Sequence, residues 1–204
     1  AAATVTDGAL LAAPGESAQD DVVHDPWRPV PSLGGHDAAP MGRVDRTALD
    51  QRADIACYTS APFTTEGLLA GAVDLDLYVT ADAICFDVSA VLSEITPEGR
   101  AVVLTQGYAR VMAAEAGPAR ISLRALCATI RPGSALRLSL AGASFPAHPV
   151  NPGTGAPPAT ARMDEAQVIT LSIAHGADTP SCLHLPWTDL RPDLSTSPLR
   201  SLLP

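Results

Sequence analysis

The sequence predicts an all-β protein built as a sandwich or jelly roll, and three observations support this prediction. Apolar and polar residues alternate with a period of two in several segments, which is typical of strands with one face in a core. Proline and glycine separate these segments at turn-compatible places, such as 96–99 and 131–133. No window of 10–12 residues has a convincing helical periodicity, and 108–116 comes nearest.

The clearest expected strand is 72–80, in which Val73, Leu75 and Leu77 point to one face while Asp74 and Asp76 point to the other. The next strand, 86–95, places a second apolar row on one face: Phe86, Val88, Ala90 and Leu92. In 120–127 the row is Ile121, Leu123, Ala125 and Cys127. The other expected strands are 55–59, 101–109, 136–140, 168–173 and 182–185.

Three stretches break this pattern: 20–53, 145–163 and the tail after Pro186. Residues 20–53 are rich in proline and glycine and are expected to wrap the surface as a long ordered loop, and 145–163 carry five prolines. Long loops in a compact domain tend to be functional or docked against another surface. We expect one sandwich domain over residues 1–204, with a core of about 4–186 and a C-terminal tail at 187–204.

Charge and hydropathy limit the partners. The net charge of −9 should repel the phosphates of nucleic acid and anionic membrane surfaces, so neither is an expected partner. No apolar run approaches 18 residues. The N-terminus has neither Met nor the features of a signal peptide, so the chain is expected to be excised from something longer and to be cytoplasmic.

The four cysteines have no ligand or redox spacing. Cys57, Cys85, Cys127 and Cys182 lie far apart. We expect small buried apolar side chains rather than disulfides or zinc ligands, which is compatible with a reducing compartment.

No catalytic, metal or cofactor site is predicted. A serine nucleophile on an α/β scaffold needs Gly-x-Ser-x-Gly, whereas 142–146 read Gly-Ala-Ser-Phe-Pro. The five histidines lack metal-binding spacing. Asp74 and Asp76 could ligate calcium, but solvated charges on a strand face are the preferred interpretation.

A family resemblance rests on segments that occur in a fixed order. Residues 25–35 (Asp-Pro-Trp-Arg-Pro-Val-Pro-Ser-Leu-Gly-Gly) resemble the opening of the C-terminal domain of cocaine esterase-like (CocE/NonD) hydrolases, which X-prolyl dipeptidyl aminopeptidases share. Similar segments follow at 42–46, 54–62, 87–101, 132–133, 144–146, 151–155 and 180–186. No segment is diagnostic alone, but their shared order and spacing are specific.

The resemblance implies a jelly roll of the galactose-binding-like type without catalytic residues. The family's Ser-Asp-His triad lies in an α/β-hydrolase domain, which would precede Ala1 here. The parent would be an esterase, acylase or X-Pro dipeptidyl-peptidase, and this chain would pack on that catalytic domain. In the family the loop after Gly-Gly reaches the substrate mouth, and here it contains His36, Asp37 and Met41. A homo-oligomer is also compatible with the resemblance.

Two other functions stay open at this stage. An independent carbohydrate- or ligand-binding sandwich would need exposed aromatic residues on one face, and the chain offers Trp27, Tyr78 and Trp187. A self-sufficient esterase would need a nucleophile that the sequence does not display. The accessory-domain hypothesis instead predicts a broad apolar patch on one sheet or in 20–53, because an isolated domain exposes what it normally buries.

Overall fold

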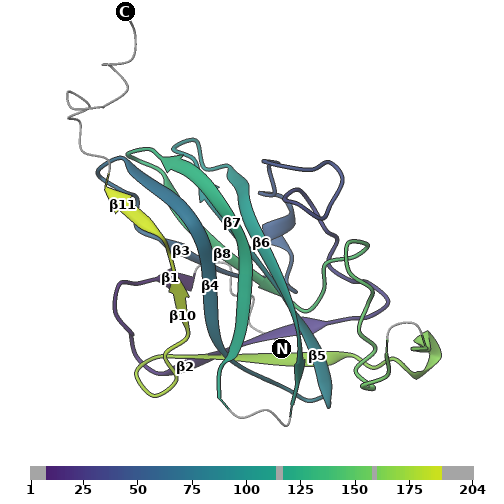
Figure 1. Cartoon of the computed structure of the whole chain (residues 1–204). Coiled ribbons are helices and arrows are strands. Elements are labelled where there is room, and N and C mark those ends of the chain that lie inside the picture. Colours follow the sequence, from purple (N-terminus) through teal and green to yellow (C-terminus); the bar gives the residue numbers. More distant parts are fainter. Residues whose placement is uncertain (1–7, 114–116, 158–159, 190–204) are drawn as a thin grey trace, which may run out of the picture.

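The computed structural model describes residues 8–113, 117–157 and 160–189, which form a sandwich of two sheets (Figure 1). The described part contains no α-helix and two single-turn 3₁₀ helices, η1 (Leu49–Gln51) and η2 (Met163–Glu165). The strands are β1 (Gly8–Leu10), β2 (Ala18–His24), β3 (Ala56–Ser60), β4 (Gly67–Ala81), β5 (Cys85–Ile95), β6 (Ala101–Met112), β7 (Ala119–Ile130), β8 (Ala135–Ala141), β9 (Ile169–His175), β10 (Cys182–His184) and β11 (Trp187–Asp189). The predicted all-β sandwich is confirmed.

The strand order is that of a jelly roll. One sheet runs β1-β3-β8-β5-β6, and the other contains β7-β4-β9-β2, with β10 and β11 also paired to β4. Apart from the short parallel pair β1–β3, all these pairs are antiparallel. Consecutive strands alternate between the two sheets from β1 to β5 and from β6 to β9, whereas β5 and β6 are neighbours in one sheet, as in a Greek-key sandwich.

The core lies between the two sheets and is filled by the predicted rows. On β4, Val73, Leu75 and Leu77 are buried, and on β5 Phe86 and Leu92 are buried as well. Their partners across the sandwich come from β7, β8 and β9: Ile121, Leu123, Ile130, Leu136, Leu138, Leu140, Ile169, Leu171 and Ile173. Aliphatic side chains thus supply most of this core, as the low aromatic content requires.

The second half of β7 faces opposite to the prediction. Its pairing with β4 shifts register between Gly71 and Val73, where β7 contributes one residue more than β4. This β-bulge reverses the alternation, so Ala125 and Cys127 are exposed while Leu126 packs against the core. The sequence alternation could not reveal the bulge because Leu126 and Cys127 are both acceptable core residues.

The cysteine prediction is half wrong. All four thiols are free, and Cys57 and Cys85 are buried as expected, but Cys127 and Cys182 are exposed. Cys182 lies on the short strand β10, directly opposite Asp76, whose side chain belongs to the solvent face of β4. Burial raises the pKa of the Cys57 thiol, which favours its protonated, unreactive form.

The long loop begins later than predicted, because 20–24 belong to β2. This strand pairs along its full length with β9. Its two charged residues are held by neighbours: the Tyr58 hydroxyl donates to Asp20, and the Ser172 hydroxyl donates to Asp21. The strand was not predicted because Asp20 and Asp21 interrupt the alternation of apolar and polar residues at its start.

The expected C-terminal tail starts with a strand. The indole of Trp187 in β11 stacks on Phe63 at 4.5 Å between ring centroids. It also covers Gly67, where an added Cβ would lie 1.9 Å from the indole. Positions 190–204 of that tail, like 114–116 of the weak helical candidate, lie outside the described residues; Tyr108 through Met112 are part of β6.

Candidate functional site

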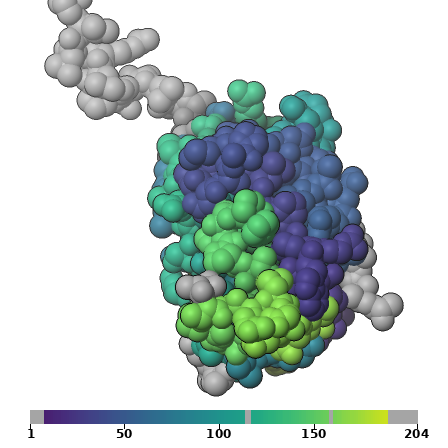
Figure 2. All heavy atoms as spheres, turned by 90° about the vertical axis from the view of Figure 1, so that its right-hand side faces the viewer, coloured from purple at the N-terminus to yellow at the C-terminus, as the bar shows by residue number. Residues whose placement is uncertain are grey.

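Two long loops form one face of the molecule, which we call the loop face. Loop A comprises residues 25–54 and loop B residues 142–168, and Figure 2 shows them side by side. They are joined by backbone hydrogen bonds, from Ser32 N to Phe145 O at 2.7 Å and from Phe145 N to Val30 O at 3.0 Å. Among the described residues of 145–163, the predicted irregular character is confirmed up to Met163, where η2 begins.

Loop A covers the outer surface of the five-stranded sheet. Val30 and Leu49 pack on Ile55, Cys57 and Ala141 in a small apolar cluster separate from the main core. Burial of this cluster fixes the loop against β3 and β8.

Because of this cover, β5 is buried on both faces. Its inner row was predicted, but the outer positions Ser89 and Ser93 are also buried. On β4, by contrast, the outward-facing positions carry the charged residues Asp74 and Asp76. Asp74 pairs with Arg120, and Asp76 pairs with His184. Apart from Asp87, the outer positions of β5 carry uncharged residues (Ser89, Val91 and Ser93), and these were the available signal for a covered sheet face.

A buried ion cluster ties η1 to this polar sheet face. Asp50 Oδ1 accepts hydrogen bonds from Arg46 Nε at 2.8 Å and from Ser139 Oγ at 3.0 Å. Its second oxygen lies 3.6 Å from Arg137 Nη1. Oδ2 is buried and has no hydrogen bond within the described residues, so the charge of Arg137 is what compensates it. These contacts fix η1 against β8.

A second cluster fixes loop B. Asp87 accepts two hydrogen bonds from Arg110, at 2.8 and 3.0 Å, and one from Asn151 Nδ2 at 2.9 Å. The Tyr108 hydroxyl also donates to Asp87. Burial, together with the Asp87 charge, raises the pKa of Tyr108, so this phenol stays protonated as the donor that the cluster needs.

The predicted mouth residues His36, Asp37 and Met41 share a short exposed tip of loop A. The tip is closed by a reciprocal pair of backbone hydrogen bonds between Gly35 and Gly42, at 2.8 and 2.7 Å. Glycine is required at Gly35, where φ is 68° and an added Cβ would lie 2.4 Å from the Gln106 side chain. The structure thus brings the three residues together at the surface.

Asp37 anchors this tip to three other elements. Gln106 of β6 donates to it at 3.2 Å, Arg124 of β7 at 3.5 Å, and His148 Nε2 of loop B lies 3.8 Å away. The His148 ring in turn stacks on Tyr108, with centroids 3.8 Å apart. The tip is therefore held in one position, while Met41 is 70% exposed.

Apolar side chains are exposed on the loop face. Trp27 and Met41 of loop A and Phe145 of loop B are 56%, 70% and 46% exposed. Sequence analysis placed the apolar patch either on a sheet or in 20–53. Of the eight large apolar side chains exposed among the described residues, five lie on the two loops, and Leu11, Ile84 and Met112 lie outside them, so the distribution favours the loops. Phe145 was missed because sequence analysis treated it as part of a failed nucleophile motif, a family-like segment and an irregular stretch, but not as an exposed side chain.

His24, His175 and His184 contact carbonyl or carboxylate oxygens and not serine. His24 is buried with Nε2 3.3 Å from Asn151 O, and this burial lowers its pKa. His175 and His184 contact Asp20 and Asp76 at 3.0 and 2.9 Å. Across the described ranges, no serine hydroxyl is hydrogen-bonded to a histidine, and no group of three His, Cys, Asp or Glu side chains could hold a metal ion.

Comparison with protein families gives the decisive match: the X-Pro dipeptidyl-peptidase C-terminal non-catalytic domain matches residues 2–183. The chain belongs to this family. The predicted resemblance is therefore confirmed, and this non-catalytic domain is one that CocE/NonD-type hydrolases carry.

Relatives of this non-catalytic domain are hydrolases much longer than the chain. A cocaine esterase from Rhodococcus sp. (strain MB1 Bresler) is 29% identical over an alignment of 204 positions, gaps included, and the alignment covers 91% of the chain and 35% of the esterase. The chain thus spans about a third of that relative.

Solved structures share the fold. An aminopeptidase from a marine sediment Thaumarchaeota archaeon superposes with a TM-score of 0.75 at 18% identity, covering 87% of the chain and 34% of the aminopeptidase. An α-amino acid ester hydrolase superposes with a TM-score of 0.72 at 21% identity, covering 83% of the chain and 32% of that hydrolase. A CocE/NonD family hydrolase from Staphylococcus aureus superposes with a TM-score of 0.56 at 14% identity, covering 87% of the chain and 34% of that hydrolase. None of the helices in the described segments of the domain is long and apolar enough to cross a membrane.

Proposed function

We propose that this chain is the C-terminal domain of a serine hydrolase that acts on esters or amides, and that it packs on an α/β-hydrolase catalytic domain through the loop face. The parent enzyme would be an esterase, an acylase or an X-Pro dipeptidyl-peptidase, with the catalytic domain encoded before Ala1. The observation that carries this proposal is the exposure of Trp27 and Phe145 on two loops that are otherwise firmly anchored. Large exposed apolar side chains gathered on one face are typical of interaction surfaces.

The anchoring supports a docking role. Loop A is held by the Asp50 cluster and loop B by the Asp87 cluster, so both loops present their apolar side chains from fixed positions. A preorganised surface loses little conformational entropy when it binds a partner.

The tip with His36, Asp37 and Met41 is proposed to border the substrate mouth of that catalytic domain. Asp37 would fix the tip through its contacts with Gln106 and Arg124. His36 and Met41 would then project toward the partner, since both are exposed. The role of the tip would be to shape the entrance and not to carry out chemistry.

The test is reconstitution. The 204-residue chain should bind the separately expressed catalytic domain and restore its ester or amide hydrolysis. Trp27→Ser and Phe145→Ser should each weaken binding at least about tenfold, which is the typical effect of removing an aromatic anchor. Leu11→Ser is the matched control, because Leu11 is 67% exposed and its segment lies on the other side of the sandwich from the two loops in Figure 1.

Tip variants separate docking from mouth shaping. Met41→Ser should leave binding intact while changing KM for bulky substrates. Absence of binding and of rescue by the unaltered chain would refute the proposal; equal weakening by Leu11→Ser would refute the assignment of the loop face.

An independent carbohydrate-binding module is the alternative, favoured only by the exposure of Trp27 and Phe145 on the same face. Aromatic side chains of this kind can stack on sugar rings. Trp187 is less suited, because it stacks on Phe63. A glycan array with no bound sugar would eliminate this alternative.

Assembly and location complete the proposal. We propose a cytoplasmic protein, because all four thiols are free, as expected in a reducing compartment. Cell fractionation tests this location.

The chain is also proposed to self-associate through the loop face when its catalytic domain is absent. Sedimentation of the unaltered chain and of Trp27→Ser tests this self-association.

A further inference from the structure

His24 lies where the two loops meet. It is the last residue of β2, it is 3% exposed, and loop A begins directly after it. Loop B packs against its side chain: an added Cβ at Gly142 would lie 2.6 Å from His24 Cβ, and Asn151 O is 3.3 Å from His24 Nε2. Because a carbonyl oxygen only accepts hydrogen bonds, Nε2 carries the proton of the neutral ring and donates to Asn151. One buried imidazole therefore contacts both the first residue of loop B and its anchoring residue.

The two aromatic residues of the loop face are attached close to this ring. Trp27 lies in the turn that starts at Asp25, and its N–H donates to the Asp25 carboxylate at 3.0 Å. Phe145 lies in the part of loop B that packs on His24, and its N–H donates to Val30 O of loop A at 3.0 Å. Displacement of loop B at His24 would therefore break the bond between the loops and free both aromatic residues from their fixed positions.

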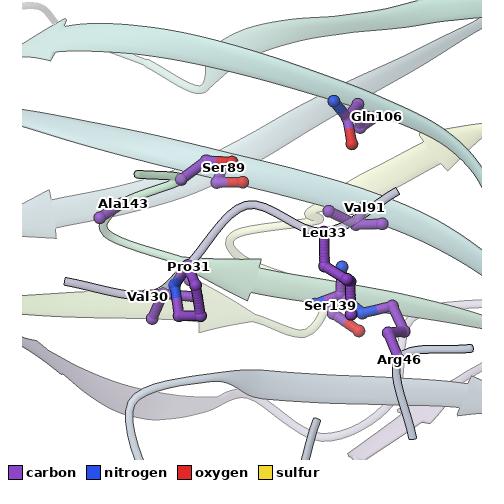
Figure 3. A pocket seen from close by; sticks show the side chains of 11 residues that line it. Val30, Pro31, Leu33, Arg46, Ser89, Val91, Gln106, Ser139 and Ala143 are labelled. Atoms are coloured by element: carbon purple, nitrogen blue, oxygen red, sulfur yellow. The ribbon is translucent and has the colours of Figure 1, made fainter. Parts of the chain in front are cut away.

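The loops are held at this junction by polar contacts more than by dense packing. Figure 3 shows a cavity of about 10 Å³ between Val30 and Pro31 of loop A, Ala143 of loop B, and the sheet residues Ser89 and Ser139. Residues that line a cavity have fewer atoms in contact with them, so less dispersion energy opposes their separation from the sheet. Local opening of the loops is thus less costly here than opening of the core.

The surroundings of His24 oppose a positive charge on its ring. Its nearest neighbours in β9 and loop B are the uncharged residues Leu171, Gly142 and Asn151. Charged groups face it from loop A and from β5, with β6 supplying a partner to one of them: Asp25, Asp54, Asp87, Arg52 and Arg110. Burial lowers the pKa of His24 and outweighs both the hydrogen bond to Asn151 and the three carboxylates, which act in the opposite direction.

We propose that His24 is an acid-sensitive latch of the loop face: the neutral imidazole is stable beneath loop B, and its protonation at acid pH releases loop B and the Trp27 turn. The release is a local opening, because hydration of the ring requires loop B to move away but leaves the sandwich core closed. As pH falls below 6.5, the open form binds the proton more tightly than the closed form, so the closed form loses population. The latch is a property of this chain alone, whereas its consequence, weaker docking at acid pH, rests on the proposed function.

Hydrogen exchange of the 204-residue chain at about pH 5 and about pH 7.5 tests the latch. After correction for the intrinsic exchange rate, the amides of Arg28, Phe145 and Gly153 should exchange at least about threefold faster at the lower pH. Each of these amides donates a hydrogen bond within the two loops, whereas the amide of Leu75 lies in β4 and should keep its protection. Equal protection of the loops at both pH values would overturn the proposal, and so would a parallel increase at Leu75, which would mean that the whole sandwich opens.

A histidine variant assigns the response to the latch. Glutamine can donate to Asn151 O but takes up no proton, so His24→Gln should make exchange in the loops independent of pH. His184→Gln is the control, because His184 is an exposed histidine of β10 that pairs with Asp76, and this variant should retain the full response. A response that persists in His24→Gln would place the effect at another group and overturn the assignment.

The unaltered chain provides a second measurement in case glutamine does not fit beneath loop B. An NMR titration follows the His24 imidazole and the amides of Phe145 and Gly153 in one sample, and all three should change with a common midpoint below pH 6.5. Different midpoints would overturn the proposal. Neither experiment contains a catalytic domain, so failure of the latch and failure of docking are observed separately.

Discussion

Substitution of Asp87 by Asn should release loop B from the sheet. The carboxylate accepts from Arg110, Tyr108 and Asn151, with two donors on each oxygen. An amide at this position would turn its NH₂ group toward two of these donors, which cannot be satisfied. Arg110 is about a third exposed and can be hydrated, so the main loss falls on the buried Asn151 or Tyr108 contact. A hydrogen bond to a charged group contributes about 1.5–3 kcal/mol, and an unsatisfied buried donor costs about 1–3 kcal/mol.

We therefore expect Asp87→Asn to lower the free energy of unfolding by roughly 2–4 kcal/mol. Urea unfolding measures this loss, and amide hydrogen exchange should become faster in residues 148–155 than in β4. Asp164→Asn is the matched control, because Asp164 is an exposed carboxylate in the same loop and its loss should leave stability unchanged. A loss below about 1 kcal/mol, or uniform acceleration of exchange throughout the sandwich, would refute the reasoning.

Three further outcomes are expected. Burial lowers the pKa of His24 below its ordinary 6.5, so the unfolded chain binds one proton more than the folded chain as pH falls below 6.5. The free energy of unfolding should therefore decline below that pH by up to about 1.4 kcal/mol per pH unit. His24→Gln should reduce this decline, which urea unfolding measures. Gly67→Ala should displace Trp187, whose indole lies 1.9 Å from the added Cβ, and shift tryptophan fluorescence to the red; an unchanged spectrum would contradict this contact. A thiol reagent should label Cys127 and Cys182 in the native chain, and modification of all four cysteines would contradict the burial of the other two.

The fold could be predicted wherever one face of a strand meets the core and the other meets water. In β4 this holds along Val73–Leu77, so period-two alternation gave the correct inner face. In β7 it failed after Leu123, because one additional residue in the bulge reverses the alternation and leaves no mark in composition. In β2 it failed because Asp20 and Asp21 are stabilised by hydroxyl groups from distant strands.

The candidate site could be predicted only in part. The family resemblance identified the tip with Asp37, but the residues that hold Asp37 lie far along the chain. Gln106 is 69 positions away, and Arg124 is 87 positions away. The same is true of Asp87 and Asn151, which are separated by 64 positions. Such partners have no period, since they meet only after the two loops have folded over the sheet.

These distant contacts explain how a loop face can remain fixed over a sheet surface that is polar. Ser89, Ser93 and Ser139 offer loop A little apolar area, so hydrophobic burial alone would position it weakly. Hydrogen-bonded charges are more directional, and a buried network is stable only when its members find their intended partners. Asp50 and Asp87 therefore act as two attachment points, one for each loop. Because these polar contacts and the small buried cluster around Val30 make the attachment, the exposed apolar residues are not needed for it, and Trp27 and Phe145 remain free to bury their surface against another domain.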